Sequence, residues 1–97
     1  TQPNTIFALS SGAPPAAIGI IRISGPASAT ALEALTGSVP PAREARLRSI
    51  RGAAGEKLDE GLILWFPGPK SATGEDCAEL HCHGGRAVVE AILSALG

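Results

Sequence analysis

The chain contains few aromatic residues, no methionine and almost no net charge. Aromatic residues make up 3% of its 97 positions, with one Trp and no Tyr. A hydrophobic core must therefore be built from Ile, Leu, Val and Ala. The formal net charge of -1 provides no bulk attraction to nucleic acid or to an anionic membrane. We therefore expect any connection with RNA to come from a partner or from another part of a longer protein.

Long apolar runs and a cysteine framework are missing as well. No apolar run approaches the roughly 20 residues that a membrane-spanning helix needs. No charged and then apolar segment opens the chain as a secretory signal would. The two cysteines, Cys77 and Cys82, would point to opposite faces of a shared strand and could not form a disulfide. These absences predict a protein of the reducing cytoplasm that has no membrane partner.

The length allows one small domain, which we place over residues 1–97. The sequence begins without Met and stops directly after an apolar helical pattern. We therefore expect an excised fragment whose domain is truncated at its carboxyl-terminal end.

Alternating and continuous apolar patterns predict five strands and two helices. The predicted strands cover residues 5–9, 18–24, 45–50, 61–66 and 77–82, and the predicted helices cover residues 26–35 and the segment after Gly85. The third and fourth strands form a predicted hairpin, and residues 10–15 form a Gly- and Pro-containing loop. Residues 18–24 are apolar at both even and odd positions, which predicts a central strand covered on both faces. The predicted fold class is α+β, a small mixed β-sheet with helices packed on it.

The strand near residue 80 has one polar face and one apolar face. Its polar face would carry Cys77, Glu79, His81 and His83, while the neighbouring positions Ala78, Leu80 and Cys82 would meet the core. Cysteine, glutamate and histidine are all zinc ligands. However, four residues of one strand extend over about 20 Å and cannot converge on one ion. We therefore predict no metal ligand, and keep a small metal-binding domain that uses Cys77, His81 and His83 as an alternative.

Two charged residues stand out because each needs a partner. Arg22 interrupts an aliphatic strand, so either a carboxylate of the fold pairs with it or it points into a pocket for an anionic ligand. Glu79 offers two acceptors side by side, which suits a heterocycle with adjacent N–H and NH2 groups, such as a pterin. The alternative for Glu79 is an ion pair with a neighbouring strand. From the residues alone, the structural ion pair is favoured in both cases.

Other patterns indicate no chemistry of their own. The chain has no G-x-x-x-x-G-K-[ST] motif, and its serines and histidines lack a spacing typical of a triad, so we identify no catalytic residue. A small basic cluster is accompanied in sequence by four carboxylates, which favours a solvated hairpin face over an RNA-binding patch. The cluster comprises Arg43, Arg46, Arg48 and Arg51, and the carboxylates are Glu44, Glu56, Asp59 and Glu60.

Four stretches together resemble one family. They are NTIFAL at residues 4–9, GIIRISG at 19–25, LDEG at 58–61 running on to LWFPGP at 64–69, and TGEDCAELHCHGG at 73–85. In this order, and over nearly the whole chain, they resemble the amino-terminal domain of the MnmE (TrmE) family of tRNA modification GTPases. Each motif alone is weak, whereas the four together are specific.

The resemblance implies a folate-binding and dimerisation module. It implies a fold similar to the folate-binding domain of the glycine cleavage aminomethyltransferase, a homodimer, and a bound tetrahydrofolate derivative, either 5-formyl- or 5,10-methylene-tetrahydrofolate. Arg22 and Glu79 occupy the positions of family folate contacts, which reverses the preference given above. A purely structural dimerisation module remains the alternative. The fragment is not expected to be an enzyme in isolation.

The resemblance also implies what the full-length protein does. With the flavoprotein MnmG, it would modify the wobble uridine of tRNA with a folate one-carbon unit. GTP, magnesium and potassium would be bound outside this fragment. The family domain continues past residue 97 with a further basic folate contact, and its GTPase domain and carboxyl-terminal catalytic cysteine also lie outside. Cys82 and Lys70 stand where the family more often has Gly and Asn, and the loop 71–74 is expected to close over the folate site.

Overall fold

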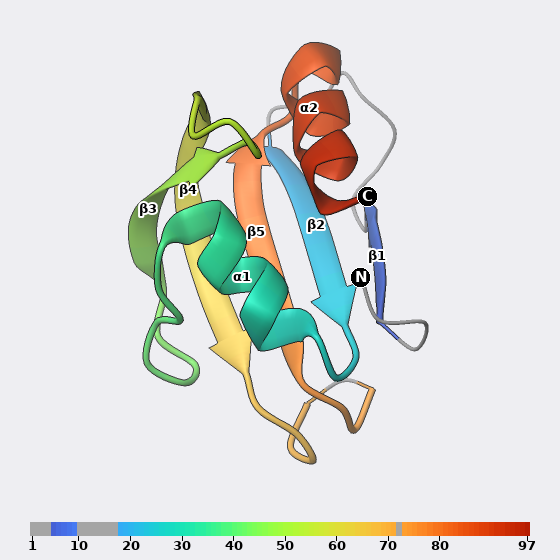
Figure 1. Ribbon diagram of the computed structural model, residues 1–97. Helices are drawn as coiled ribbons and strands as arrows, with labels where there is room; N and C mark the ends of the chain where they lie inside the picture. The colour runs from blue at the N-terminus through green and yellow to red at the C-terminus, as the bar shows by residue number, and fades with distance from the viewer. Residues whose placement is uncertain (1–4, 10–17, 72) are drawn as a thin grey trace.

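The structure is a computed structural model that describes residues 5–9, 18–71 and 73–97. It has two layers, a five-stranded sheet and two helices that lie on one face of that sheet (Figure 1). The elements in chain order are β1 (Ile6–Leu9), β2 (Ile18–Ser24), α1 (Ser28–Thr36), β3 (Arg46–Arg51), β4 (Lys57–Phe66), β5 (Cys77–His83) and α2 (Arg86–Leu96). The loop predicted at residues 10–15 lies outside the described residues. Neither described helix is long and apolar enough to cross a bilayer.

The sheet order is β1-β2-β5-β4-β3, and every named pair of strands is antiparallel. The parallel component is an isolated bridge between Ala42 and Trp65. The predicted α+β class is therefore confirmed, as is the predicted hairpin of β3 and β4. The expected similarity to the glycine cleavage aminomethyltransferase domain remains a prediction.

Two predicted boundaries were wrong by more than one residue. Strand β4 begins at Lys57 and not at residue 61, because its ladder with β3 continues to Asp59 opposite Ile50 and passes a register shift to reach Lys57. Helix α1 begins at Ser28 and not at residue 26. Gly25, at a φ of 136° that favours glycine, turns the chain first, and the Ser28 hydroxyl donates to the carbonyl oxygens of Gly25 and Asp76.

The core is aliphatic, as the composition predicted. Helix residues Leu32 and Ile92 pack with sheet residues from β2, β4 and β5, and all are 0% exposed. The sheet residues of this set are Ile21, Ile23, Ile63 and Leu80. Burying each such side chain contributes about 1.5–3 kcal/mol, which makes this layer the main source of stability.

One predicted feature of β2 is contradicted. The strand was expected to be covered on both faces, yet both described helices lie on the side of Ile21 and Ile23. On the other side, Ile18 is 58% exposed and Arg22 is partly exposed. Apolar residues on both faces of a strand are typical of a buried strand, but here no helix of the described residues lies on the second face. We call this second side the open face and the helix side the covered face.

Candidate functional site

Arg22 and Glu79 meet at the centre of the open face. The antiparallel register of β2 and β5 sets them directly opposite each other, and β2 and β5 both have a neighbouring strand on each side. Arg22 Nη2 lies 2.7 Å from Glu79 Oε2, and the side chains are 42% and 18% exposed. The structure thus brings together the two residues that the sequence singled out. It also shows the ion pair that the residues alone favoured.

A third residue, His81, completes this cluster. His81 follows Glu79 on the same face of β5, and its Nε2 atom lies 3.0 Å from Glu79 Oε1. Partial burial raises the pKa of Glu79, but hydrogen bonds from His81 and Arg22 and their charges outweigh this and bring the pKa below its usual value. Glu79 is therefore held as a carboxylate, with one neighbour on each oxygen.

The surroundings of this cluster are flat and largely aliphatic. Leu64 pairs with Glu79, Ala8 pairs with Arg22, and both Ile20 and Leu62 pair with His81. Beside His81 lies a hollow of about 240 Å³. It is lined by Ile18, Leu47, Glu60, Gly61, Leu62, His81, Cys82 and His83. Leu47 and Leu62 are 60% and 44% exposed, so the open face presents apolar surface around a charged centre.

One glycine determines how closely β4 approaches β5 here. A Cβ atom on Gly61 would lie 2.3 Å from the main-chain oxygen of His81. Real Cβ atoms do not tolerate such a distance, so only glycine fits without a shift of the backbone. Gly61 therefore positions the strand that carries Glu79 and His81.

The loop predicted to close over the site reaches the end of the same strands. The Thr73 hydroxyl lies 2.7 Å from the Ser24 hydroxyl and 3.1 Å from Cys77 Sγ, while Ala72 lies outside the described residues. Burial raises the pKa of the Cys77 thiol, but hydrogen bonds from nearby hydroxyl groups outweigh it and lower the pKa. Cys77 is only 2% exposed and contacts Thr73 of this loop, whereas the Glu79 side chain remains 18% exposed.

The remaining polar residues of β5 have separate partners. His83 is 75% exposed, and both its ring Nδ1 and its main-chain N–H contact the Asp59 carboxylate at 2.8 Å. Within the described part of the chain, no group of three or more His, Cys, Asp or Glu residues is arranged to hold a metal ion. The alternative zinc ligands Cys77, His81 and His83 thus do not converge.

The two cysteines lie on opposite faces as predicted, and both are free. Cys82 is 3% exposed and packs in the core, which confirms its predicted place. Burial and the Asp59 charge raise the pKa of its thiol.

The sequence patterns did not predict two side-chain contacts, that of His81 with Glu79 and that of His83 with Asp59. The contact of His81 with Glu79 could have been found, because residues two apart on a strand share a face. The contact of Asp59 with His83 could not, because these residues are 24 positions apart and meet only through the fold.

Comparisons with known proteins agree with the family resemblance of the four sequence stretches. A family model described as the GTP-binding protein TrmE N-terminus matches residues 5–97. The tRNA modification GTPase MnmE of Erythrobacter litoralis is 69% identical over 93 residues, which are 96% of this chain and 22% of that protein. The MnmE of Sinorhizobium medicae is 62% identical over 93 residues, 96% of this chain and 21% of that protein.

A mitochondrial relative from Rattus norvegicus, named as a subunit of 5-taurinomethyluridine-[tRNA] synthase, is 61% identical over 97% of this chain and 20% of its own length. The chain therefore spans about a fifth of the length of these relatives. The family model covers nearly every residue, and the matched range includes the strands of Arg22 and Glu79. The chain belongs to the family of amino-terminal domains of the tRNA modification GTPase MnmE, or TrmE.

Proposed function

We propose that this chain binds a tetrahydrofolate derivative and forms a homodimer, as the amino-terminal module of a GTPase that modifies the wobble uridine of tRNA. The observation that carries the folate site is the cluster of Arg22, Glu79 and His81 at the centre of the open face. A partly exposed ion pair contributes little to stability, so stability alone does not account for a charged cluster at this place.

Glu79 and Arg22 keep free hydrogen-bond acceptors and donors after they have formed their ion pair. A carboxylate has about four lone-pair sites on its two oxygens. Arg22 takes one on Oε2 and His81 takes one on Oε1, so each oxygen keeps a site for a further donor. Glu79 can therefore accept the adjacent N–H and NH2 groups of a pterin edge. Arg22 donates one hydrogen bond to Glu79 and keeps donors for a carbonyl or carboxylate of the ligand.

The shape of the site also suits a flat bicyclic ring. The paired side chains Leu64, Leu62 and Ile20 form an aliphatic surface next to Glu79 and His81. A ring laid on this surface would bury apolar area while its polar edge meets Glu79. The folate, as 5-formyl- or 5,10-methylene-tetrahydrofolate, would supply the one-carbon unit. This chain would bind and orient it.

The rest of the activity belongs to the part of the relatives that lies beyond this chain. The relatives are about five times longer, and their names describe a GTPase or a tRNA-modifying synthase. Binding of GTP, magnesium and potassium, and action with the flavoprotein MnmG on tRNA in the cytoplasm, are therefore proposed for the full-length protein.

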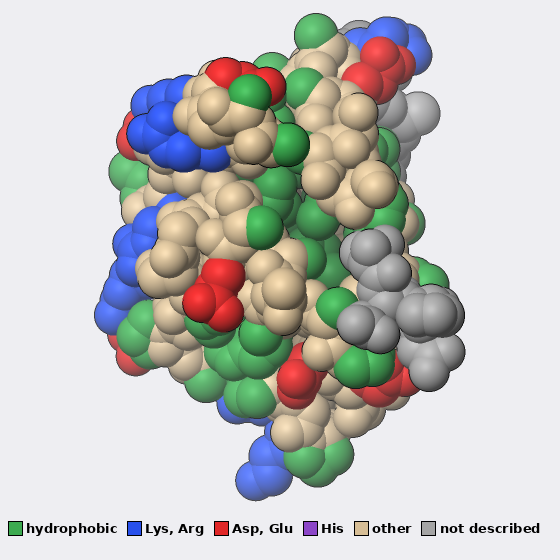
Figure 2. Space-filling view, in the orientation of Figure 1, with side chains coloured by type: hydrophobic (Ala, Val, Ile, Leu, Met, Phe, Trp, Pro, Cys, Tyr) green, Lys and Arg blue, Asp and Glu red, His purple; other side chains and the backbone are tan. Residues whose placement is uncertain are grey.

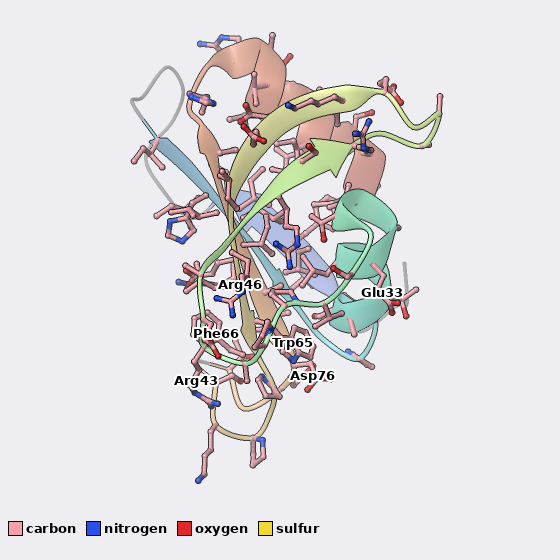
Figure 3. The ribbon with its side chains drawn as sticks, turned by 90° about the vertical axis from the view of Figure 1, so that its left-hand side faces the viewer. Glu33, Arg43, Arg46, Trp65, Phe66 and Asp76 are labelled. Carbon is pink, nitrogen blue, oxygen red and sulfur yellow. The ribbon has the colours of Figure 1, made fainter. Side chains whose placement is uncertain are left out.

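The folate site is tested by titrating the chain with 5-formyltetrahydrofolate in a calorimeter. We expect saturable binding that Glu79→Ala weakens by about 1–3 kcal/mol, the value of a lost hydrogen bond to a charged group. Glu33→Ala is the matched control, since it removes an exposed carboxylate from α1 on the covered side (Figure 3). Equal affinity of the two variants, or no saturable binding by the parent chain, would contradict the proposal.

Dimerisation is supported by a separate observation. Four large apolar side chains remain at least 44% exposed, namely Ile6, Ile18, Leu47 and Leu62. By strand pairing all four lie on the open face, so a second copy could bury them together. Sedimentation equilibrium with and without the folate separates the possibilities. A dimer that forms equally well without folate, with no folate signal in calorimetry, would favour the purely structural module, and a monomer at every concentration would contradict dimerisation.

A further inference from the structure

Positive charge gathers along the edge of the sheet that β3 forms. Six of the eight Lys and Arg residues of the chain lie between residues 43 and 70. We call this set the β3 basic edge, and it comprises Arg43, Arg46, Arg48, Arg51, Lys57 and Lys70. Figure 2 shows Lys and Arg side chains along the side of the molecule that β3 occupies in Figure 1. The same segment holds four of the nine Asp and Glu residues, so its formal charge is +2 within a chain of net charge -1.

The backbone arranges these side chains in a row. Strand β3 is the last strand of the sheet and pairs only with β4. Residues two apart on a strand lie about 6.6 Å from each other, so Arg46 and Arg48 project on the same side of the strand. At one end Arg43, which Figure 3 labels, donates to the carbonyl oxygen of Lys70 in the loop after β4. At the other end lies Arg51, beside the β3–β4 turn.

Two of the four carboxylates that lie near this row in sequence have other partners. Asp59 binds His83, and Glu56 accepts a hydrogen bond from the main-chain N–H of Ala54. Two ion pairs remain, Arg46 with Glu44 at 2.8 Å and Lys57 with Glu60 at 3.9 Å. Sequence proximity predicted a solvated hairpin face, and two of the four nearby carboxylates, Glu44 and Glu60, do pair with basic residues of the row.

Three arginines of the row have no carboxylate partner among the described residues. Arg43, Arg48 and Arg51 each donate to a main-chain carbonyl oxygen, and none forms an ion pair among the described residues. A carbonyl orients a guanidinium without neutralising it, and the guanidinium keeps most of its five N–H donors.

Arg43 also has an unusual backbone conformation. It has a φ of 62°, in the left-handed region that favours glycine. Its main-chain N–H is held by the Trp65 carbonyl oxygen at 2.8 Å. Strained residues of this kind occur in turns and also cluster at functional sites.

From this row we infer that the β3 basic edge binds the phosphate backbone of RNA. The choice of RNA over other polyanions rests on the proposed role in tRNA modification. Guanidinium groups match phosphate geometry with paired hydrogen bonds. A strand of six residues spans about 20 Å, so the row follows several phosphates and not one. Contacts of this kind position the RNA without reading its sequence. The row lies at the sheet edge, apart from the Arg22–Glu79 cluster on β2 and β5.

The test is fluorescence anisotropy of a labelled, unmodified tRNA transcript with the chain, at salt concentrations from 50 to 200 mM. Each neutralised phosphate contributes a slope of roughly 0.7–0.9 to the dependence of log K on log salt. Three arginines therefore predict an affinity loss of about 20- to 40-fold over this range. Arg48→Gln should make the slope shallower by roughly 0.7–0.9, and tRNAs of different sequence should be affected alike.

Two further variants protect the test against folding artefacts. Arg43→Gly relaxes the backbone, so it should unfold at the same or a higher urea concentration than the parent while it binds tRNA more weakly. Arg86→Gln, on α2, makes the same change in net charge as Arg48→Gln but lies outside the row. It should leave the slope unchanged.

The outcomes are distinguishable from those of the folate experiment. Glu79→Ala should leave tRNA binding unchanged, so either proposal can fail alone. The inference is overturned if Arg48→Gln and Arg86→Gln give the same slope, or if the chain does not bind tRNA at 50 mM salt. It is also overturned if a polyglutamate peptide binds more tightly than tRNA, since the edge would then suit an acidic protein.

Discussion

The two faces of the sheet use the same strands in opposite ways. On the covered face, Ile21, Ile63 and Leu80 are 0% exposed beneath the helices. On the open face, neighbouring residues of the same strands, Arg22 and Glu79, form an ion pair that remains in contact with solvent. A partly exposed pair contributes little to stability because water screens it. Burial on one face therefore holds the fold, and the other face can carry polar groups without disturbing the core.

The strongest test of this comparison uses two adjacent residues of β4. Ile63 is 0% exposed on the covered face, and Leu62 is 44% exposed on the open face. Ile63→Ala should lower the free energy of unfolding by about 2–5 kcal/mol, because it removes buried methyl groups and leaves a cavity. Leu62→Ala should cost about 1 kcal/mol or less. Urea unfolding monitored by circular dichroism measures both.

The matched pair can also fail in an informative way. A large cost for Leu62→Ala that grows with protein concentration would show that the open face is buried between copies. A cost for Ile63→Ala as small as that for Leu62→Ala would contradict the assignment of the two faces.

A smaller effect is expected from the charges of the open face as pH changes. The pKa of Glu79 is lower in the folded chain than its usual value, since hydrogen bonds from His81 and Arg22 outweigh the effect of burial. Its contribution to stability is therefore complete above the unfolded-state pKa of about 4.3 and is lost as pH falls through the lower folded pKa. The parent chain should lose stability as the pH is lowered from about 5, and Glu79→Gln should lose less over the same interval.

Arg22→Gln provides the control for this pH dependence. It removes one of the two groups that lower the pKa of Glu79, so the acid-dependent loss should lie between those of the parent and Glu79→Gln. Asp59 also has a lowered pKa, because its hydrogen bonds with His83 and Glu60 and the His83 charge outweigh the raising effect of burial. It contributes equally to all three proteins and cancels in the differences. Identical pH profiles for all three would remove the Arg22–Glu79–His81 cluster as a source of stability.

Local patterns predicted the elements well and their surroundings less well. The strand of residues 18–24 was predicted with the bounds that β2 has, because branched apolar residues between turn formers are unambiguous. Its coverage was predicted wrongly, because apolar residues on both faces of a strand do not reveal which face receives the helices. The start of α1 was missed because it depends on Ser28 donating to Asp76, a residue 48 positions away.

The candidate site was likewise predictable in its individual residues but not in the contacts between them. Alternation on β5 identified Glu79 as a residue of the polar face, and the charge of Arg22 in an aliphatic strand required a partner. The identity of that partner depended on the register between β2 and β5. The partner of Asp59 shows the same dependence on register, since Asp59 lies near the arginines of β3 in sequence but contacts His83 in the fold.

The sequence by itself determined the aliphatic core, the strand and helix segments, the separation of the two cysteines and the family, because each is encoded in composition or in short-range order. The tertiary structure alone decided which face stays open, that Arg22 and Glu79 form an ion pair, and which arginines of β3 have no ion-pair partner among the described residues. These depend on strand register and on contacts between residues that are distant in the chain, and no local pattern specifies them.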